Sequence, residues 1–129
     1  MNLDANVNNQ IFRKDYPQVI AKNRHLASLA ACRLLPTGNN AYPAGLVLAA
    51  RIDGFFVPYV NGGASGTGTA VAVLNETIQD DGTYPTLMGR GIFAGELFYA
   101  ALIGVDSNAV SNLNARTYTA SDGNEILKF

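Results

Sequence analysis

Two residues of this chain could in principle form a nucleophile and its base, Cys32 and His25. A histidine next to a cysteine can take the thiol proton and activate the sulfur for covalent catalysis. The same residue types bind zinc, but a zinc site needs about four ligands, and no carboxylates cluster near this pair. Cys32 stands among alanines and leucines, so we predict that it is a small buried hydrophobe and that His25 lies at the surface. The sequence predicts neither an enzyme nor a metal site.

The glycine-rich stretch Gly62–Gly68 resembles a phosphate-binding loop only in composition. It lacks the Lys-Ser/Thr ending of a P-loop, and no helical pattern follows that could offer a helix N-terminus to a phosphate. Asp53 and the pair Asp80-Asp81 stand beside glycines, and turn formation explains each of them. A calcium loop would need more oxygen ligands at regular spacing. We therefore expect no cofactor.

Three arginines, Arg51, Arg90 and Arg116, lie among apolar or small residues. They could be solvated residues on strand faces. They could equally contact another subunit, where a planar guanidinium is often useful. Both interpretations stay open from the sequence.

Composition indicates one domain without a preference for polyanions. The chain has 129 residues, of which 48% are hydrophobic and 15% charged, and its formal net charge is −1. These values fit a single packed core and argue against nucleic acid or an anionic membrane as the main partner. The longest apolar run, Leu97–Val105, is too short to span a bilayer, and the N-terminus does not resemble a signal peptide. A single cysteine excludes an internal disulfide and fits synthesis in a reducing compartment.

The elements that must position these residues are mostly short strands. Asp53-Gly54 is a strong hairpin signal, because glycine readily adopts positive φ, and Pro58 places its strand at an edge or a strand end. The expected central elements are a strand at Gly45–Leu48, a return strand at Phe55–Tyr59, a loop at Asn61–Gly66 and a strand at Thr67–Leu74.

The flanking regions give weaker signals. Asn23–Leu35 fits either a helix or a strand, and the turn residues that follow favour a strand near its end. Glycines within Gly89–Glu96 indicate a bend or a close backbone approach. The remaining expectations are a polar turn at Gln79–Thr83, a buried segment at Leu97–Ile103, a helix at Ser107–Ala115 capped by Asp106 or Ser107, a turn at Ser121–Asn124 and a final strand at Glu125–Phe129.

Residues 1–21 show no sustained period of 2 or 3.6, and Tyr16-Pro17 interrupts them further. They could be a solvated tail, or an extended arm that orders on a partner. The number of apolar residues favours an arm, and we assign residues 22–129 to the folded domain. The candidate partner-binding residues of the arm are Leu3, Val7, Ile11, Phe12, Tyr16, Val19 and Ile20.

Several motifs taken in order resemble the lambda-type bacteriophage head decoration proteins. Gly45-Leu46-Val47-Leu48, Asp53-Gly54, Val57-Pro58-Tyr59 and the segment Gly66–Leu74 follow the family's "G-x-V-L" strand, turn, second strand and "G-x-x-x-A-v-a-I-L" segment. Gly89–Leu97 resembles a later strand of the family. The helix and the closing strand also come in the family's order. The resemblance covers roughly residues 34–129, and no residue of the N-terminal third matches.

This resemblance implies a mainly β, barrel-like "β-tulip" domain with one short α-helix and an extended N-terminal arm. It implies a non-enzymatic homotrimer on the outer surface of the virion capsid, made in the bacterial host cytoplasm, that cements the expanded head against internal DNA pressure. The partner would be the major capsid protein, with no direct contact to nucleic acid or membrane. The arm, flexible when free, would be the capsid-binding element and would add a strand to the capsid protein.

A second hypothesis remains open, in which the chain is a small β-barrel binding module of a phage tail or baseplate, or a carbohydrate-binding domain. The absence of tryptophan argues against sugar stacking, although six tyrosines leave it possible. Such a module would need a concave pocket formed within Gly45–Ile103.

Overall fold

The computed structural model describes residues 18–129 except 37, 39, 81 and 83–84. Strands dominate this part of the chain, and its one α-helix is α2 (Ser107–Asn112). Two short 3-10 helices are η1 (Arg24–Leu26) and η2 (Tyr99–Ala101). The strands are β1 (Ile20–Lys22), β2 (Ser28–Leu34), β3 (Asn40–Tyr42), β4 (Val47–Ala50), β5 (Phe56–Pro58), β6 (Ala70–Leu74), β7 (Ile78–Asp80), β8 (Leu87–Ala94), β9 (Glu96–Phe98), β10 (Arg116–Thr119) and β11 (Glu125–Lys128).

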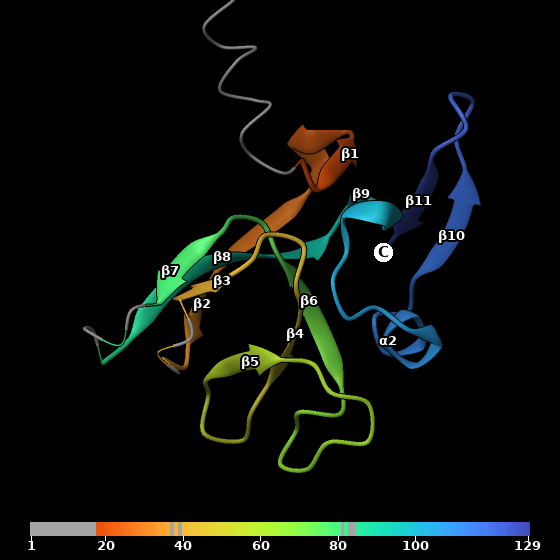
Figure 1. The fold of residues 1–129 in the computed structure, drawn as a ribbon. Coiled ribbons are helices and arrows are strands. Elements are labelled where there is room, and N and C mark those ends of the chain that lie inside the picture. Colours follow the sequence, from red (N-terminus) through yellow and green to blue (C-terminus); the bar gives the residue numbers. More distant parts are fainter. Residues whose placement is uncertain (1–17, 37, 39, 81, 83–84) are drawn as a thin grey trace, which may run out of the picture.

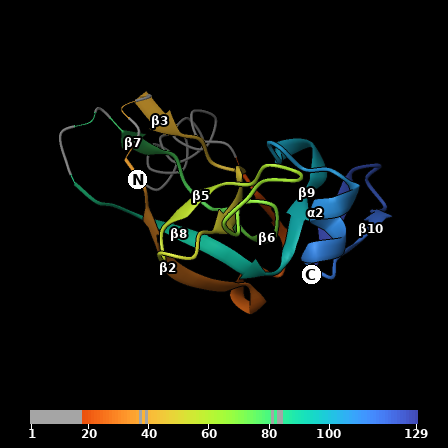
Figure 2. The same cartoon turned by 90° about the horizontal axis from the view of Figure 1, so that it is seen from below.

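Five strands form a small closed barrel in the order β2-β5-β4-β6-β8 (Figures 1 and 2). The long antiparallel pair β2–β8 runs from Ser28 opposite Ala94 to Leu34 opposite Leu87. The parallel contact between Leu34 and Phe56 brings β5 against β2 and closes the ring. The expected mainly β fold, with a barrel and one short helix, is confirmed.

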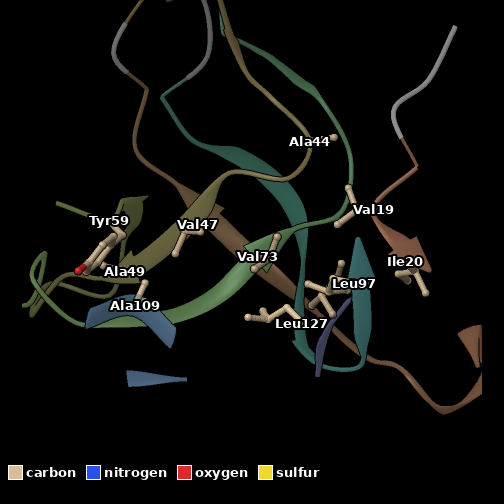
Figure 3. Close-up of a cluster of buried hydrophobic side chains, with 12 residues drawn as sticks. Val19, Ile20, Ala44, Val47, Ala49, Tyr59, Val73, Leu97, Ala109 and Leu127 are labelled. Atoms are coloured by element: carbon tan, nitrogen blue, oxygen red, sulfur yellow. The ribbon is translucent and has the colours of Figure 1, made fainter. Parts of the chain in front are cut away.

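Two smaller sheets flank the barrel. A four-stranded sheet has the order β1-β9-β11-β10, and β3 pairs with β7 in a two-stranded sheet. The larger hydrophobic cluster joins the barrel to the four-stranded sheet, and Figure 3 shows Val73 of the barrel together with Leu97 and Leu127 of that sheet. A second cluster contains Cys32, Leu34, Tyr42, Leu46, Leu48, Leu74 and Leu87.

Two glycines of β8 lie where neighbouring side chains leave no room for a Cβ atom. A Cβ on Gly91 would lie 2.5 Å from Cys32 Sγ, and one on Gly89 would lie 2.9 Å from Leu74 Cδ1. Real Cβ atoms do not approach so closely, so a larger residue at either position would force the neighbouring side chain to move. The predicted close backbone approach within Gly89–Glu96 is confirmed.

The predicted central hairpin is also present, with shorter strands. Gly54 has φ +90° and donates its N–H to Arg51 O, and β5 ends at Pro58 as the proline requires. β4 begins at Val47 rather than Gly45, because Gly45 has φ +88° and packs its backbone directly against Ala101 O. Thr69 and the residues before it belong to the preceding loop, so β6 begins at Ala70.

The helix begins where the sequence predicts and ends three residues early. The Asp106 side chain accepts a hydrogen bond from Ala109 N at 2.7 Å, which caps the first turn. At the other end Asn114 has φ +55° and bonds to Ser111 O, while Ala115 N bonds to Val110 O. This is a Schellman motif with asparagine in the left-handed position, and it terminates α2 at Asn112.

Other expectations were wrong or incomplete. Gln79 and Asp80, expected in a turn, lie in β7, because they pair with Ala41 and Asn40 of β3. Asp80 is buried, and its side chain accepts hydrogen bonds from Gly38 N and Gly82 N. Burial of Leu97–Ile103 holds for Leu97 but not for Ile103, which is 45% exposed. The backbone of Ile103 bonds to Gly45 and Val47, and its side chain is left in solvent. The sequence also did not predict the short strands β1, β3, β9 and β10.

The region 23–35, which the sequence left open, is η1 followed by β2, so the preference for a strand near its end is confirmed. The turn at 121–124 and the final strand, β11, are present as expected. Within the described residues, none of the helices is long and apolar enough to cross a membrane.

We predict that Gly91→Ala destabilises the protein by about 1–3 kcal/mol, because the added methyl group overlaps the Cys32 sulfur. Denaturant unfolding measures the change. A double variant that also carries Cys32→Ala removes the overlapping sulfur and should show a favourable coupling of about 1 kcal/mol. A Gly91→Ala protein as stable as its parent would contradict this view of the barrel interior.

Candidate functional site

The arm residues proposed from sequence divide into two groups. Leu3, Val7, Ile11, Phe12 and Tyr16 lie outside the described residues. Val19 and Ile20 are only 2% and 6% exposed and belong to the larger hydrophobic cluster, near Leu97 (Figure 3). Their side chains are therefore already buried within this chain, and the folded domain begins before the sequence-derived boundary at residue 21.

β1 attaches the N-terminal segment to an edge of the four-stranded sheet. Ile20 pairs with Leu97 and Lys22 with Glu96, and Phe98 N donates to Val19 O at 2.9 Å. Among the described residues, β1 has a strand neighbour on one side only. This antiparallel pairing fixes the first described strand to the sheet.

Glu96 is the polar centre of the same region. Tyr118 Oη donates to Glu96 Oε1 at 2.6 Å, and Asn23 Nδ2 donates to Glu96 Oε2 at 2.5 Å. These two hydrogen bonds, from Tyr118 first, hold the pKa of the Glu96 carboxyl below its usual value. The nearby Lys128 and Lys22 act in the same direction. The carboxylate thus links the end of β1 to β9 and β10.

A shallow pocket of about 180 Å³ opens beside this junction. Its wall includes Leu26, whose side chain is 69% exposed, and the carboxylate-bearing Glu96. Four of its seven lining residues fall outside residues 45–103, where the binding-module hypothesis expects a concave site. The lining residues are Asn23, Leu26, Ala94, Gly95, Glu96, Lys128 and Phe129.

Cys32 is fully buried, as the sequence predicts, and burial raises the pKa of its thiol. The sulfur contacts Ala30 O at 3.8 Å. The backbone of His25 lies in η1, but its side chain is outside the described part of the chain. Among the residues that the structure describes, no three His, Cys, Asp or Glu side chains gather to hold a metal ion.

A polar network connects α2 to the barrel. Tyr59 Oη donates to Asp106 Oδ1 at 2.9 Å and accepts from Asn108 Nδ2 at 2.8 Å. Asn112 Oδ1 accepts from Ala70 N at 3.0 Å. The Asn112 bond holds the helix against the start of β6, and the Tyr59 bonds hold its first turn against the residue that follows β5, so the network has a structural explanation.

The three arginines singled out from sequence have different environments. Arg51 forms an ion pair with Asp53 within the β4–β5 hairpin. Arg90 and Arg116 are exposed and have no carboxylate partner among the described residues. Sequence reasoning passed over Arg33, whose guanidinium lies 4.5 Å from the centre of the Phe55 ring. Only the strand register could have shown that Arg33 and Arg90 lie on one face.

The comparisons with known proteins add no relative. No family model matches the chain, and neither a curated protein nor a solved structure matches it. The resemblance stated from the sequence motifs therefore rests on those motifs alone.

The lowered pKa of Glu96 predicts a pH-dependent contribution to stability. Because the folded-state pKa lies below the unfolded one, the contribution is complete above the ordinary glutamate range and is lost as the pH falls through the folded-state value. Tyr118→Phe removes the first cause of the shift. We expect this variant to be less stable than the parent at neutral pH, with the difference shrinking in acid. Thermal unfolding at a series of pH values measures it.

The matched control for this prediction is Glu125→Gln, which removes an exposed carboxylate from the neighbouring β11. It should leave the difference between parent and Tyr118→Phe unchanged. A difference between parent and Tyr118→Phe that stays constant from neutral to acidic pH would count against a role for the ionised Glu96.

Burial also predicts that the Cys32 thiol is unreactive in the folded protein. A maleimide should label it on the order of 10³-fold or more slowly than in denaturant, because reaction requires opening of the barrel. Mass spectrometry of timed samples measures the rate. The control is Ala31→Cys in a Cys32→Ala background, which moves the thiol to an exposed position on the same strand. Equal labelling rates for the two proteins would contradict the prediction.

Proposed function

We propose that this chain is a capsid decoration protein. It binds the outer surface of an expanded bacteriophage head as a homotrimer and stabilises the shell against the pressure of the packaged DNA. Its partner is the major capsid protein. The work it performs is mechanical, so it requires complementary surfaces and a stable fold and no catalytic group.

The observation that carries this proposal is where the family-like motifs fall in the fold. Gly45–Leu48 leads into β4, Val57–Tyr59 overlaps β5, Gly66–Leu74 ends in β6 and Gly89–Leu97 spans most of β8. These four strands are consecutive neighbours in the barrel, in the order β5-β4-β6-β8. The motifs therefore form one continuous structural unit, which supports a common fold with the family that they resemble.

The geometry of β1 supports a role for the N-terminal segment in attachment. An extended peptide can bind by adding a strand to the edge of a partner's sheet, with its backbone giving affinity and alternate side chains giving fit. Such a segment needs a firm connection to its own domain. The burial of Val19 and Ile20 and the pairing of β1 with β9 provide that connection.

The candidate capsid-binding residues are consequently fewer than the sequence suggested. Val19 and Ile20 belong to the domain core, so the capsid-binding set becomes Leu3, Val7, Ile11, Phe12 and Tyr16. A truncation that removes residues 1–21 would also remove two core residues. It would test folding and binding together, so the variant must stop at residue 17.

Co-sedimentation with expanded, undecorated heads tests the proposal. The intact chain should bind saturably. Replacement of residues 1–17 by a glycine-serine segment of equal length should weaken binding by roughly 10²-fold or more, because a trimer loses all three arms together. The replacement keeps chain length and leaves the core intact, so thermal unfolding of the two proteins should agree. An intact chain that fails to bind these heads would overturn the proposal.

A further inference from the structure

The strand pair β2–β8 presents one face to the barrel interior, and its outward face is exposed from Ala31 to Arg33 and from Met88 to Arg90 but buried at Ile92, which belongs to the larger hydrophobic cluster. Cys32 and Leu34 of β2 and the two glycines of β8 point inward and are buried. In register, Ala31 lies opposite Arg90 and Arg33 opposite Met88. Since directly opposite residues share a face, these four exposed residues form one outward surface, which we call the β2–β8 face. Figure 2 shows the two strands side by side along one margin of the barrel.

Two unneutralised positive charges lie on this face. Arg33 and Arg90 are diagonal cross-strand neighbours, a relation that places the two residues about 7–8 Å apart. Among the described residues, neither guanidinium forms an ion pair, whereas Arg51 is paired with Asp53. Arg33 is also held in place by the ring of Phe55. Its planar guanidinium is thus already oriented to donate hydrogen bonds to a carboxylate.

The residues around the two arginines are those typical of protein interfaces. Met88 is 58% exposed, a large apolar side chain on an otherwise regular strand. The Phe55 ring lies against the Arg33 guanidinium, and the small side chain of Ala31 lies opposite Arg90. Arginine, methionine and aromatic residues are enriched at interfaces, while lysine and acidic residues are depleted there, and the face has none of the latter. This composition favours a protein partner with a flat contact surface.

We propose that the β2–β8 face docks an acidic segment of the capsid protein, with carboxylates that pair with Arg33 and Arg90 around an apolar contact at Met88. This inference rests on the proposed function and names a second contact, separate from the N-terminal arm. Two-fold pairing of this face with the same face of a second copy is disfavoured, because it would bring two positively charged surfaces together. Nucleic acid is disfavoured by the formal net charge of −1 and by the small number of basic residues on the face.

The test is binding of single variants of the full-length chain to expanded, undecorated heads, measured at several salt concentrations. Arg90→Glu should weaken binding tenfold or more, because it opposes like charges across the contact. Met88→Glu should weaken it similarly, since the new carboxylate pairs with both arginines and blocks the apolar contact. The matched control is Arg116→Glu on β10, an exposed arginine with the same change of charge, which should bind within about twofold of the parent. Circular dichroism and thermal unfolding establish that each variant is folded.

Each outcome decides between distinct conclusions. A parent chain that does not bind heads overturns the proposed function and this inference with it. If the parent binds and both β2–β8 variants bind as tightly as Arg116→Glu, the docking face is wrong and the proposed function stands. Equal weakening in all three variants would indicate a general charge effect and would also overturn the face. Binding of the parent to duplex DNA at physiological salt, lost in Arg90→Glu, would assign the face to nucleic acid instead.

Discussion

Closure of the barrel depends on two positions of β8 at which the backbone carries no side chain. Gly89 and Gly91 let β8 approach the side chains of Leu74 and Cys32, and no larger residue fits there without displacing them. The long β2–β8 pair contains both glycines, and that pair is where the first barrel strand meets the last. The remaining elements surround a barrel whose closure depends on the absence of a side chain at Gly89 and Gly91.

The same two glycines fix the strand register. A slip of one residue would turn Met88 and Arg90 into the barrel and bring the glycines to the surface. A guanidinium buried without a partner is strongly unfavourable, so the alternative pairing is excluded on both steric and electrostatic grounds. The outward position of Arg33, Met88 and Arg90 is therefore a consequence of how the interior packs. The β2–β8 face that we assign to docking therefore needs no further interaction to keep these side chains pointing outward.

Local signals in the sequence predicted the features that local chemistry determines. Asp53-Gly54 specifies its hairpin, and Asp106 specifies the start of α2, because each acts on backbone groups within a few residues. Local sequence signals gave the wrong secondary structure where residues that are distant in the sequence determine burial. Asp80 stands in the sequence context of a turn, yet it lies in β7, which pairs with the distant strand β3, and its side chain binds the backbone of Gly38. For the same reason nothing local distinguishes Arg33 and Arg90 from other arginines, since their shared face exists only once β2 and β8 are paired.

The two proposed contacts are mechanically linked. β1 leads through η1 directly into β2, so the arm's anchor and the β2–β8 face are adjacent segments of one chain. Binding of the arm to a capsid subunit would hold the face close to the same surface. The second contact would then form at a high effective concentration and would need little affinity of its own. Tension on the arm would pass through Val19, Ile20 and the Glu96 hydrogen bonds into the core rather than into a loop. A protein that resists expansion of a shell needs a connection of this kind, in which load reaches packed strands directly.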